Sequence, residues 1–395
     1  MTQKDGNGER LGTIRSHPLL RFPVPASSSL TLVLPGALPP SNIAGDIAAA
    51  LRAPVSPTPG SSPVFSAWLS RAKPKISDFD VSQQGCSPHE GWWLARAGYD
   101  LDAARANRPP EAPAPVFGAG LAPLLVPPSA DTTPVWVGRL AHIRISQDHL
   151  ALADPDELHV TEEESIELAN AARSVFELDG FSLQHLSAQD WRITPMTAGH
   201  PGIPGATPAA AVDRDIDAWW PQGTVARPWR RLVNEIQMEW YAHPVNEARR
   251  DRGQPEINTL WLFGGSPQWK PKLDATRLVG GPAWVQGLAQ AAGLPWEALT
   301  DNIASPGTIA CVGSLDLAHR EEDWGRWLIE MARLDSTLFT AAQQALTEGR
   351  VDSIELILTG HDRIAQLVIP SKRGLARWLP TPKHDWTTWW SSPNS

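Results

Sequence analysis

The sequence predicts a layered α/β fold, in which a mostly parallel sheet is flanked by helices and an α+β subdomain is inserted. At 395 residues the chain exceeds the roughly 250–300 residues that one core usually serves, so at least two packed lobes are expected. Short apolar runs alternate with amphipathic helical stretches, which is the pattern of an α/β lobe. The composition, 42% hydrophobic and 19% charged, is that of a globular protein.

The N-terminal part of the chain combines one clear strand with loop-rich sequence. Residues 1–29 lack periodicity and are expected to form a flexible arm, and Leu30–Leu34 (LTLVL) is an apolar run of the buried-strand type. Two stretches, 53–63 and 108–128, are rich in Pro, Ala and Gly and are expected to be surface connections. Residues 30–134 are therefore assigned to the N-terminal part of the α/β lobe, with Pro-rich loops.

Residues 135–195 are expected to be the inserted subdomain. The run 135–152 alternates apolar and polar residues around a turn, which predicts a hairpin that packs Trp136 and Ile145, among others. Thr161 and Glu164 have the spacing of a capping box and predict a helix that ends at Gly180. A strand then follows, so the unit is predicted to be β-β-α-β.

Residues 196–380 are assigned to the C-terminal α/β lobe. A helix beginning at Pro228 opens this part, and a long apolar stripe predicts another helix over Glu321–Leu346. Between and after these helices, apolar runs predict strands at 257–263, 308–312, 353–358 and 364–369. Residues 381–395 form a Trp-rich tail.

The overall charge and the cysteine content exclude several classes of protein. The net charge is −9 without a long run of like charge, so neither a nucleic-acid groove nor binding to an anionic membrane is indicated. Only Cys86 and Cys311 are present, which implies neither a disulfide framework nor a structural zinc site. With no apolar leader and no run of about 18 apolar residues, a cytoplasmic location is expected.

Tryptophan is abundant, with 19 residues against 8 Phe and 2 Tyr. One interpretation is core packing, in which the indole N–H bonds to a carbonyl, and the other is a stacking or partner surface. The partner surface would gain support if Trp219, Trp220, Trp386, Trp389 and Trp390 formed one exposed patch.

The most distinctive segment is 232–266, LVNEIQMEWYAHPVNEARRDRGQPEINTLWLFGGS. It resembles the hallmark of RpfE-type regulatory proteins. Its core, HPVNEARRDRGQPEINTLWLFGG, is also similar to a stretch of the cofactor-independent phosphoglycerate mutases, and residues 275–293 continue that similarity. The resemblance covers about 135–370 and implies an alkaline-phosphatase-like, phosphoglycerate-mutase-like fold.

Within this segment, arginines cluster near the end of a short helix that Asn246 could cap and Gly253 could terminate. Guanidinium groups bind phosphate or carboxylate through paired hydrogen bonds, so the cluster could grip an anion. The alternative is a solvated face on which the arginines of the cluster (Arg249, Arg250 and Arg252) pair with Glu247 and Asp251, and Asn258 is a turn residue. The candidate substrate-binding residues are His243, Asn246, Arg249 and Asn258.

The resemblance also implies chemistry that this chain alters. The mutases use two metal ions and a serine nucleophile. Where they carry a metal-binding Asp-Gly pair after the first strand, this chain has Pro35-Gly36, and proline cannot ligate a metal. Where they carry Pro-Gly-Ser-Asp, it reads Ser87-Pro88-His89-Glu90-Gly91. Ser87 is therefore either a shifted nucleophile or a helix N-cap.

The remaining metal positions are present but rearranged. The mutases' Asp-x-x-x-His pair appears as Asp316 and His319, with the aspartate one place late, and their Asp-His pair is inverted to His361-Asp362. These four side chains could form one low-affinity metal site at strand ends. The alternative is that they cap turns on a degenerate scaffold.

Two functions remain open, because a fold does not determine an activity. The first is a non-catalytic or catalytically degenerate regulatory protein that needs no cofactor and binds an anionic metabolite or a protein partner. The alternative is a metal-dependent isomerase that interconverts 2- and 3-phosphoglycerate with Mn or Zn. No nucleotide-binding glycine motif, HExxH or G-x-S-x-G element supports another enzyme class.

Overall fold

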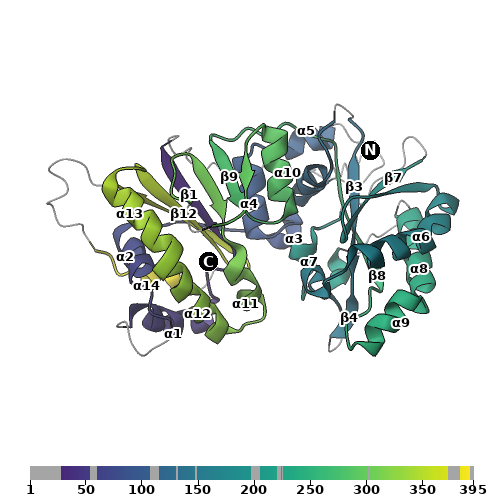
Figure 1. Cartoon of the computed structure of the whole chain (residues 1–395), viewed down its shortest axis with the longest axis horizontal. Helices are drawn as coiled ribbons and strands as arrows, with labels where there is room; N and C mark the ends of the chain where they lie inside the picture. The colour runs from purple at the N-terminus through teal and green to yellow at the C-terminus, as the bar shows by residue number, and fades with distance from the viewer. Residues whose placement is uncertain are drawn as a thin grey trace, which may run out of the picture.

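The chain folds into two lobes, each built around its own sheet (Figure 1). The computed structural model describes residues 28–53, 60–106, 115–129, 132–146, 149–196, 205–219, 224, 226–300, 303–371 and 383–391. The predicted arm at 1–29 thus lies outside the described residues, except for its last two. No helix in these ranges is both long and apolar enough to cross a membrane.

The first lobe contains the mostly parallel sheet that the sequence predicts. Its strand order is β10-β9-β11-β1-β12-β13-β2, in which the first five strands are parallel and β13 pairs antiparallel with both β12 and β2. The strands are β1 (Ser29–Leu34), β2 (Lys75–Asp78), β9 (Arg277–Gly280), β10 (Trp296–Glu297), β11 (Thr308–Cys311), β12 (Ser353–Thr359) and β13 (Arg363–Pro370).

Helices cover both faces of this sheet, so its central strands are buried on both sides. In β1, Leu30, Leu32 and Leu34 join one core while Val33 joins the other, as alternation along a strand requires. The first core is covered by α1 (Ser41–Arg52), α2 (Pro63–Arg71), α11 (Asp316–Arg320), α12 (Trp324–Leu334), a π-helical turn (Asp335–Phe339), α13 (Thr340–Glu348) and α14 (Thr387–Trp390). The second is covered by α3 (Val81–Gln84), α4 (Pro88–Arg96), α5 (Leu101–Ala106), the 3-10 helix η1 (Phe117–Leu125) and α10 (Ala283–Ala292).

The second lobe has an antiparallel sheet of order β6-β7-β3-β8, with a separate β4-β5 hairpin. The helices α6 and α8 pack over one face of the sheet, and Trp136 and Trp229 meet in the core between them. The elements are β3 (Val135–Ala141), β4 (Ile143–Ser146), β5 (His149–Leu152), η2 (Pro155–Leu158), α6 (Glu162–Leu178), β6 (Phe181–His185), β7 (Asp190–Pro195), α7 (Pro208–Ala211), η3 (Ile216–Ala218), α8 (Arg227–Tyr241), α9 (Pro244–Asp251) and β8 (Thr259–Ser266).

This lobe extends beyond the predicted subdomain at 135–195. The prediction assigned α8, α9 and β8 to the 196–380 lobe, but β8 pairs with β3, and Leu260 and Leu262 join the second lobe's core. The strand pairing spans more than a hundred residues of sequence and leaves no local signal. A hairpin does lie within the predicted range 135–152, but β4 and β5 form it. The strand β3 lies instead between β7 and β8, and Ile145 is 82% exposed rather than packed.

The tryptophan doublets mostly serve the cores. Trp92 and Trp93, both on α4, are fully buried in the second core of the first lobe. Trp386 and Trp390 are buried in the first core of that lobe. A single exposed patch of the five tryptophans named above is therefore not formed. Trp219 is half-buried and packs against the second core of the first lobe and against a smaller core of the second lobe that includes Trp261 and Phe263. Trp220 lies outside the described residues.

A carboxylate is buried in the middle of the main sheet and predicts a pH effect on stability. Glu355 is 2% exposed and accepts hydrogen bonds from Thr31 (3.0 Å) and from Gln366. Burial raises the pKa of Glu355, and these hydrogen bonds oppose the rise. Because its folded pKa lies above the unfolded value, Glu355 lowers the free energy of unfolding as pH rises from about 4.3 through the folded pKa.

We therefore expect Glu355→Gln to gain stability relative to the wild type as pH increases above about 5. The new amide could also donate to the Oε1 atom of Gln366, which has no partner among the described residues. Chemical unfolding of both proteins at several pH values measures this difference. A difference that stays constant from pH 4 to pH 8 would show that Glu355 does not titrate abnormally.

Candidate functional site

The candidate site lies where the parallel strands of the first lobe end. The loops after β1, β11 and β12 meet at this edge of the sheet, which is where open α/β sheets place their ligands. Gly36, after β1, lies so close to α11 that an added Cβ would stand 2.8 Å from the Cα of Asp316 and 2.9 Å from the Cβ of His319. The structure thus brings the loop after β1 against the predicted metal residues.

Two of the predicted metal ligands, His319 and His361, lie side by side with ring centroids 4.5 Å apart. His319 is 2% exposed, and its Nε2 lies 2.9 Å from the carbonyl oxygen of Leu38. Since a carbonyl only accepts, this Nε2 carries the proton. Burial, reinforced by the neighbouring His361, lowers the pKa of His319 to about 4. The imidazole is therefore neutral near pH 7.

The third predicted ligand, Asp316, is paired with an arginine rather than with the histidines. The Nε atom of Arg320 lies 3.3 Å from an oxygen of Asp316, and its NH1 atom donates to Asp154 in the second lobe. Burial raises the pKa of Asp154, and the charge of Arg320 opposes this rise. Arg320 thus joins the two lobes at the strand ends, beside a weaker contact from Arg214 to the carbonyl of His361 (3.4 Å).

These residues as arranged do not fit the two-metal centre that the resemblance implies. In the part of the chain that the structure describes, no group of three or more His, Cys, Asp or Glu side chains could hold a metal ion. Asp316 forms an ion pair with Arg320 (3.3 Å), and the Nε2–H of His319 bonds to the backbone, which leaves Nδ1 as the only ring nitrogen that could bind a metal. The predicted set of Asp316, His319, His361 and Asp362 lies at one edge, but it does not converge on one point.

Ser87 is the N-cap of α4. Glu90 accepts the backbone N–H of Ser87 (2.8 Å), which completes a capping box, and Glu90 also accepts from Thr207 in the second lobe (2.6 Å). The Oγ of Ser87 lies 3.1 Å from Nδ1 of His89, and both side chains are buried. The capping role anticipated from the sequence is therefore present, and α4 begins at a seam between the lobes.

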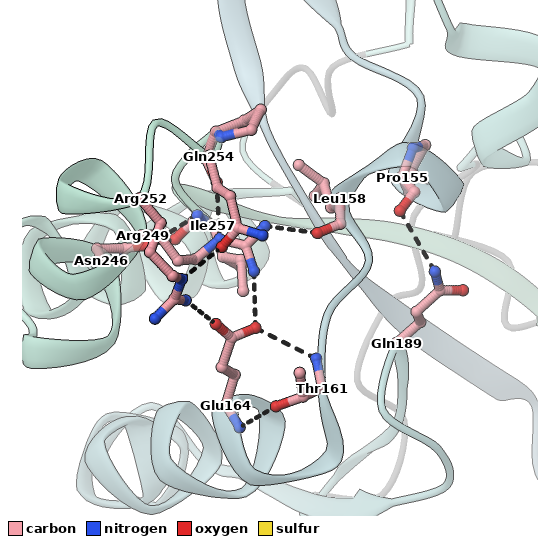
Figure 2. Close-up of polar contacts among 11 residues, drawn as sticks. Pro155, Leu158, Thr161, Glu164, Gln189, Asn246, Arg249, Arg252, Gln254 and Ile257 are labelled. Atoms are coloured by element: carbon pink, nitrogen blue, oxygen red, sulfur yellow. Dashed lines mark hydrogen bonds and ion pairs between the residues drawn. The ribbon is translucent and has the colours of Figure 1, made fainter.

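Arg249, the predicted anion-binding residue, is enclosed by the second lobe (Figure 2). Its side chain is 1% exposed and donates to Glu164 (2.6 Å) and to the carbonyls of Pro255 (2.7 Å) and Leu158 (2.5 Å). Neither expected arrangement is found. The guanidinium does not face solvent, and its acidic partner is Glu164 rather than Glu247 or Asp251, because α9 packs against the start of α6.

The other three candidates also make internal contacts. Asn246 is fully buried and bonds to the carbonyls of Trp240 and Ile257 (both 2.9 Å) and to the N–H of Ile257 (2.8 Å). His243, not Asn246, caps α9, and its Nδ1 accepts from the N–H of Val245 (3.2 Å). Asn258 exchanges two hydrogen bonds with the backbone of Ile143 (2.8 and 2.9 Å).

The two predicted sites are therefore separate. Figure 1 shows α9 at the outer end of the second lobe and α11 facing the junction between the lobes. Sequence analysis did not identify Arg320, Asp154, Glu90 or Thr207, which hold this junction together. Arg320 had one local signal, because it stands four residues after Asp316 on a helix. The partners in the second lobe had none.

Comparisons with known proteins support the fold and no more. No family model matches the chain, and no curated protein matches its sequence. Among solved structures, the PH0037 protein from Pyrococcus horikoshii is similar, with 15% identity, a TM-score of 0.50, and coverage of 91% of this chain and 92% of that one. A cofactor-independent phosphoglycerate mutase from Thermoplasma acidophilum also matches, with 12% identity, a TM-score of 0.41, and coverage of 93% and 95%.

Proposed function

We propose that this chain is a non-catalytic or catalytically degenerate phosphoglycerate-mutase-like regulatory protein of the RpfE type. The observation that carries the proposal is the arrangement at the strand ends. Pro35 stands where the resemblance places the mutases' metal-binding aspartate, Arg320 pairs with Asp316, and no group of three or more potential ligands converges in the described residues. Loss of a supporting contact alone typically costs about 10–100-fold in metal affinity or activity, and here one ligand position is a proline and another is ion-paired.

Of the two kinds of ligand considered, a protein partner is the better supported. The anionic-metabolite hypothesis rested on Arg249, whose donors are directed at Glu164 and two backbone carbonyls. We also propose that the protein needs no cofactor and is cytoplasmic. The two cysteines, Cys86 and Cys311, are both buried and unpaired, which suits a reducing compartment.

The alternative is a metal-dependent phosphoglycerate mutase that uses Mn or Zn. One observation favours it, which is that His319 and His361 lie 4.5 Å apart beside Asp316. Metal binding would require Asp316 to give up Arg320, whereas His319 could bind through its unprotonated Nδ1 while its Nε2–H stays on the carbonyl of Leu38.

Elemental analysis of the purified protein, paired with a coupled assay of 3-phosphoglycerate conversion with added Mn²⁺, separates these functions. We expect less than stoichiometric metal and no turnover above that of the buffer, while an authentic cofactor-independent mutase serves as positive control. If turnover is seen, His319→Ala and Ser87→Ala distinguish it from a contaminant. Activity that both substitutions abolish would establish the mutase and overturn the regulatory proposal.

A further inference from the structure

The outer face of α8 carries an unusual group of exposed side chains. Five residues spaced alternately by four and three positions point away from the lobe, and all five are exposed. On the opposite side of the same helix, Trp229, Val233 and Ile236 are buried. Figure 1 shows α8 on the side of the second lobe that is remote from the first. This α8 face consists of Arg227, Arg231, Asn234, Met238 and Tyr241.

Exposed apolar side chains gather at this face. Six large hydrophobic side chains in the described residues are more than 60% exposed, and four of them lie here. Met238 (64%) and Tyr241 (76%) are on α8 itself. Leu178 (83%) lies next to α8, because the following residue, Asp179, pairs with Arg231 (3.0 Å). Met196 (65%) lies close to Leu178, because its backbone N–H bonds to the carbonyl of Gly180. Such a concentration marks an interaction surface.

The charges of α8 divide along its length. Its three arginines, Arg227, Arg230 and Arg231, lie in the first half, and its two glutamates, Glu235 and Glu239, lie in the second. The helix dipole adds to this division, because its N-terminus is positive and its C-terminus is negative. An antiparallel copy of the same helix therefore presents glutamates to arginines at both ends. The face is complementary to itself under a two-fold rotation.

We propose that two copies of this chain pair through the α8 face, with the helices antiparallel and the two-fold axis at Asn234. Asn234 is the midpoint of the stripe, so Arg227 of each copy meets Tyr241 of the other, as a cation over a ring. Arg, Tyr and Met are the residue types enriched in such interfaces. The chain as a whole carries −9, whereas the residues of α8 sum to +1, so the pairing does not bring together segments that share the negative charge of the chain. The inference does not depend on the proposed function.

Charge reversal tests the pairing. Sedimentation velocity and light scattering between about 1 and 100 µM should show the wild type as a species of twice 43.0 kDa. In the antiparallel pair the N-terminal end of each α8, with Arg227, lies beside the C-terminal end of the other, which carries Glu239 as well as Tyr241. Arg227→Glu and Glu239→Arg should therefore each weaken self-association by at least about tenfold, because each places two glutamates or two arginines together at both ends. An equimolar mixture of the two variants should restore the dimer, since each altered residue then meets its opposite. Ile329→Glu, at an exposed position of α12 in the first lobe, is the matched control and should change nothing.

Crosslinking tests the position of the two-fold axis of the dimer without a measurement of binding affinity. Asn234→Cys should form a disulfide-linked dimer under mild oxidation, while Ile329→Cys should not. The natural cysteines are buried and should not contribute. A wild type that remains monomeric over the whole range would overturn the proposal. A dimer that is unaffected by charge reversal and is not crosslinked through position 234 would overturn it equally.

Discussion

Replacing Arg249 by alanine is expected to lower the free energy of unfolding by about 3–5 kcal/mol, the usual cost of breaking a buried ion pair from one side. The substitution removes the buried guanidinium that pairs with Glu164 and takes from the carbonyls of Leu158 and Pro255 the donor that Arg249, 1% exposed, gives them. Chemical unfolding followed by tryptophan fluorescence measures the loss, since Trp191 and Trp240 lie in the same core.

Arg252→Ala is the matched control for this prediction. Arg252 reaches the other oxygen of Glu164 (2.8 Å) from a half-exposed position, so its loss should cost no more than about 1 kcal/mol. The same pair of variants tests the anion-binding hypothesis. If Arg249→Ala keeps wild-type stability but loses stabilisation by phosphate or 3-phosphoglycerate, Arg249 is a ligand-binding residue and the structural role is wrong.

Replacing Trp390 by alanine is expected to cost about 3–5 kcal/mol, the range for removing a large aromatic side chain from a core. Trp390 is fully buried, with its ring 6.2 Å from Phe65 and 5.3 Å from Trp386. Its carbonyl oxygen also accepts a hydrogen bond from the buried Arg363 (2.9 Å). The substitution keeps this backbone hydrogen bond but removes one of the two buried indoles, Trp386 and Trp390, that anchor the described part of the tail in the first lobe. The melting temperature should fall accordingly.

Trp389→Ala provides the comparison, because the neighbouring indole is only half-buried. Its effect on the melting temperature should be clearly smaller. If the two substitutions had equal and small effects, the tail would be undocked in solution, and its tryptophans would again be available to a partner.

Local patterns in the sequence were sufficient for several elements. The run LTLVL is β1, and the capping box of Thr161 and Glu164 does begin α6, with the N–H of Glu164 donating to Thr161 (3.2 Å). The mostly parallel sheet also follows from alternating strands and helices. These features depend on hydrophobic periodicity and on side chains a few residues apart, so they can be read from a single sequence.

The extent of the second lobe and the roles of the candidate residues depended on contacts between distant segments. The sequence alone determined a two-lobed α/β protein and most of its main helices and strands. Only the tertiary structure decided that β8 joins β3, that Arg249 meets Glu164 85 positions away, and that Arg320 reaches Asp154 in the second lobe. Burial and pairing between distant residues set whether a charged side chain is a ligand or a structural contact, and no local pattern records them.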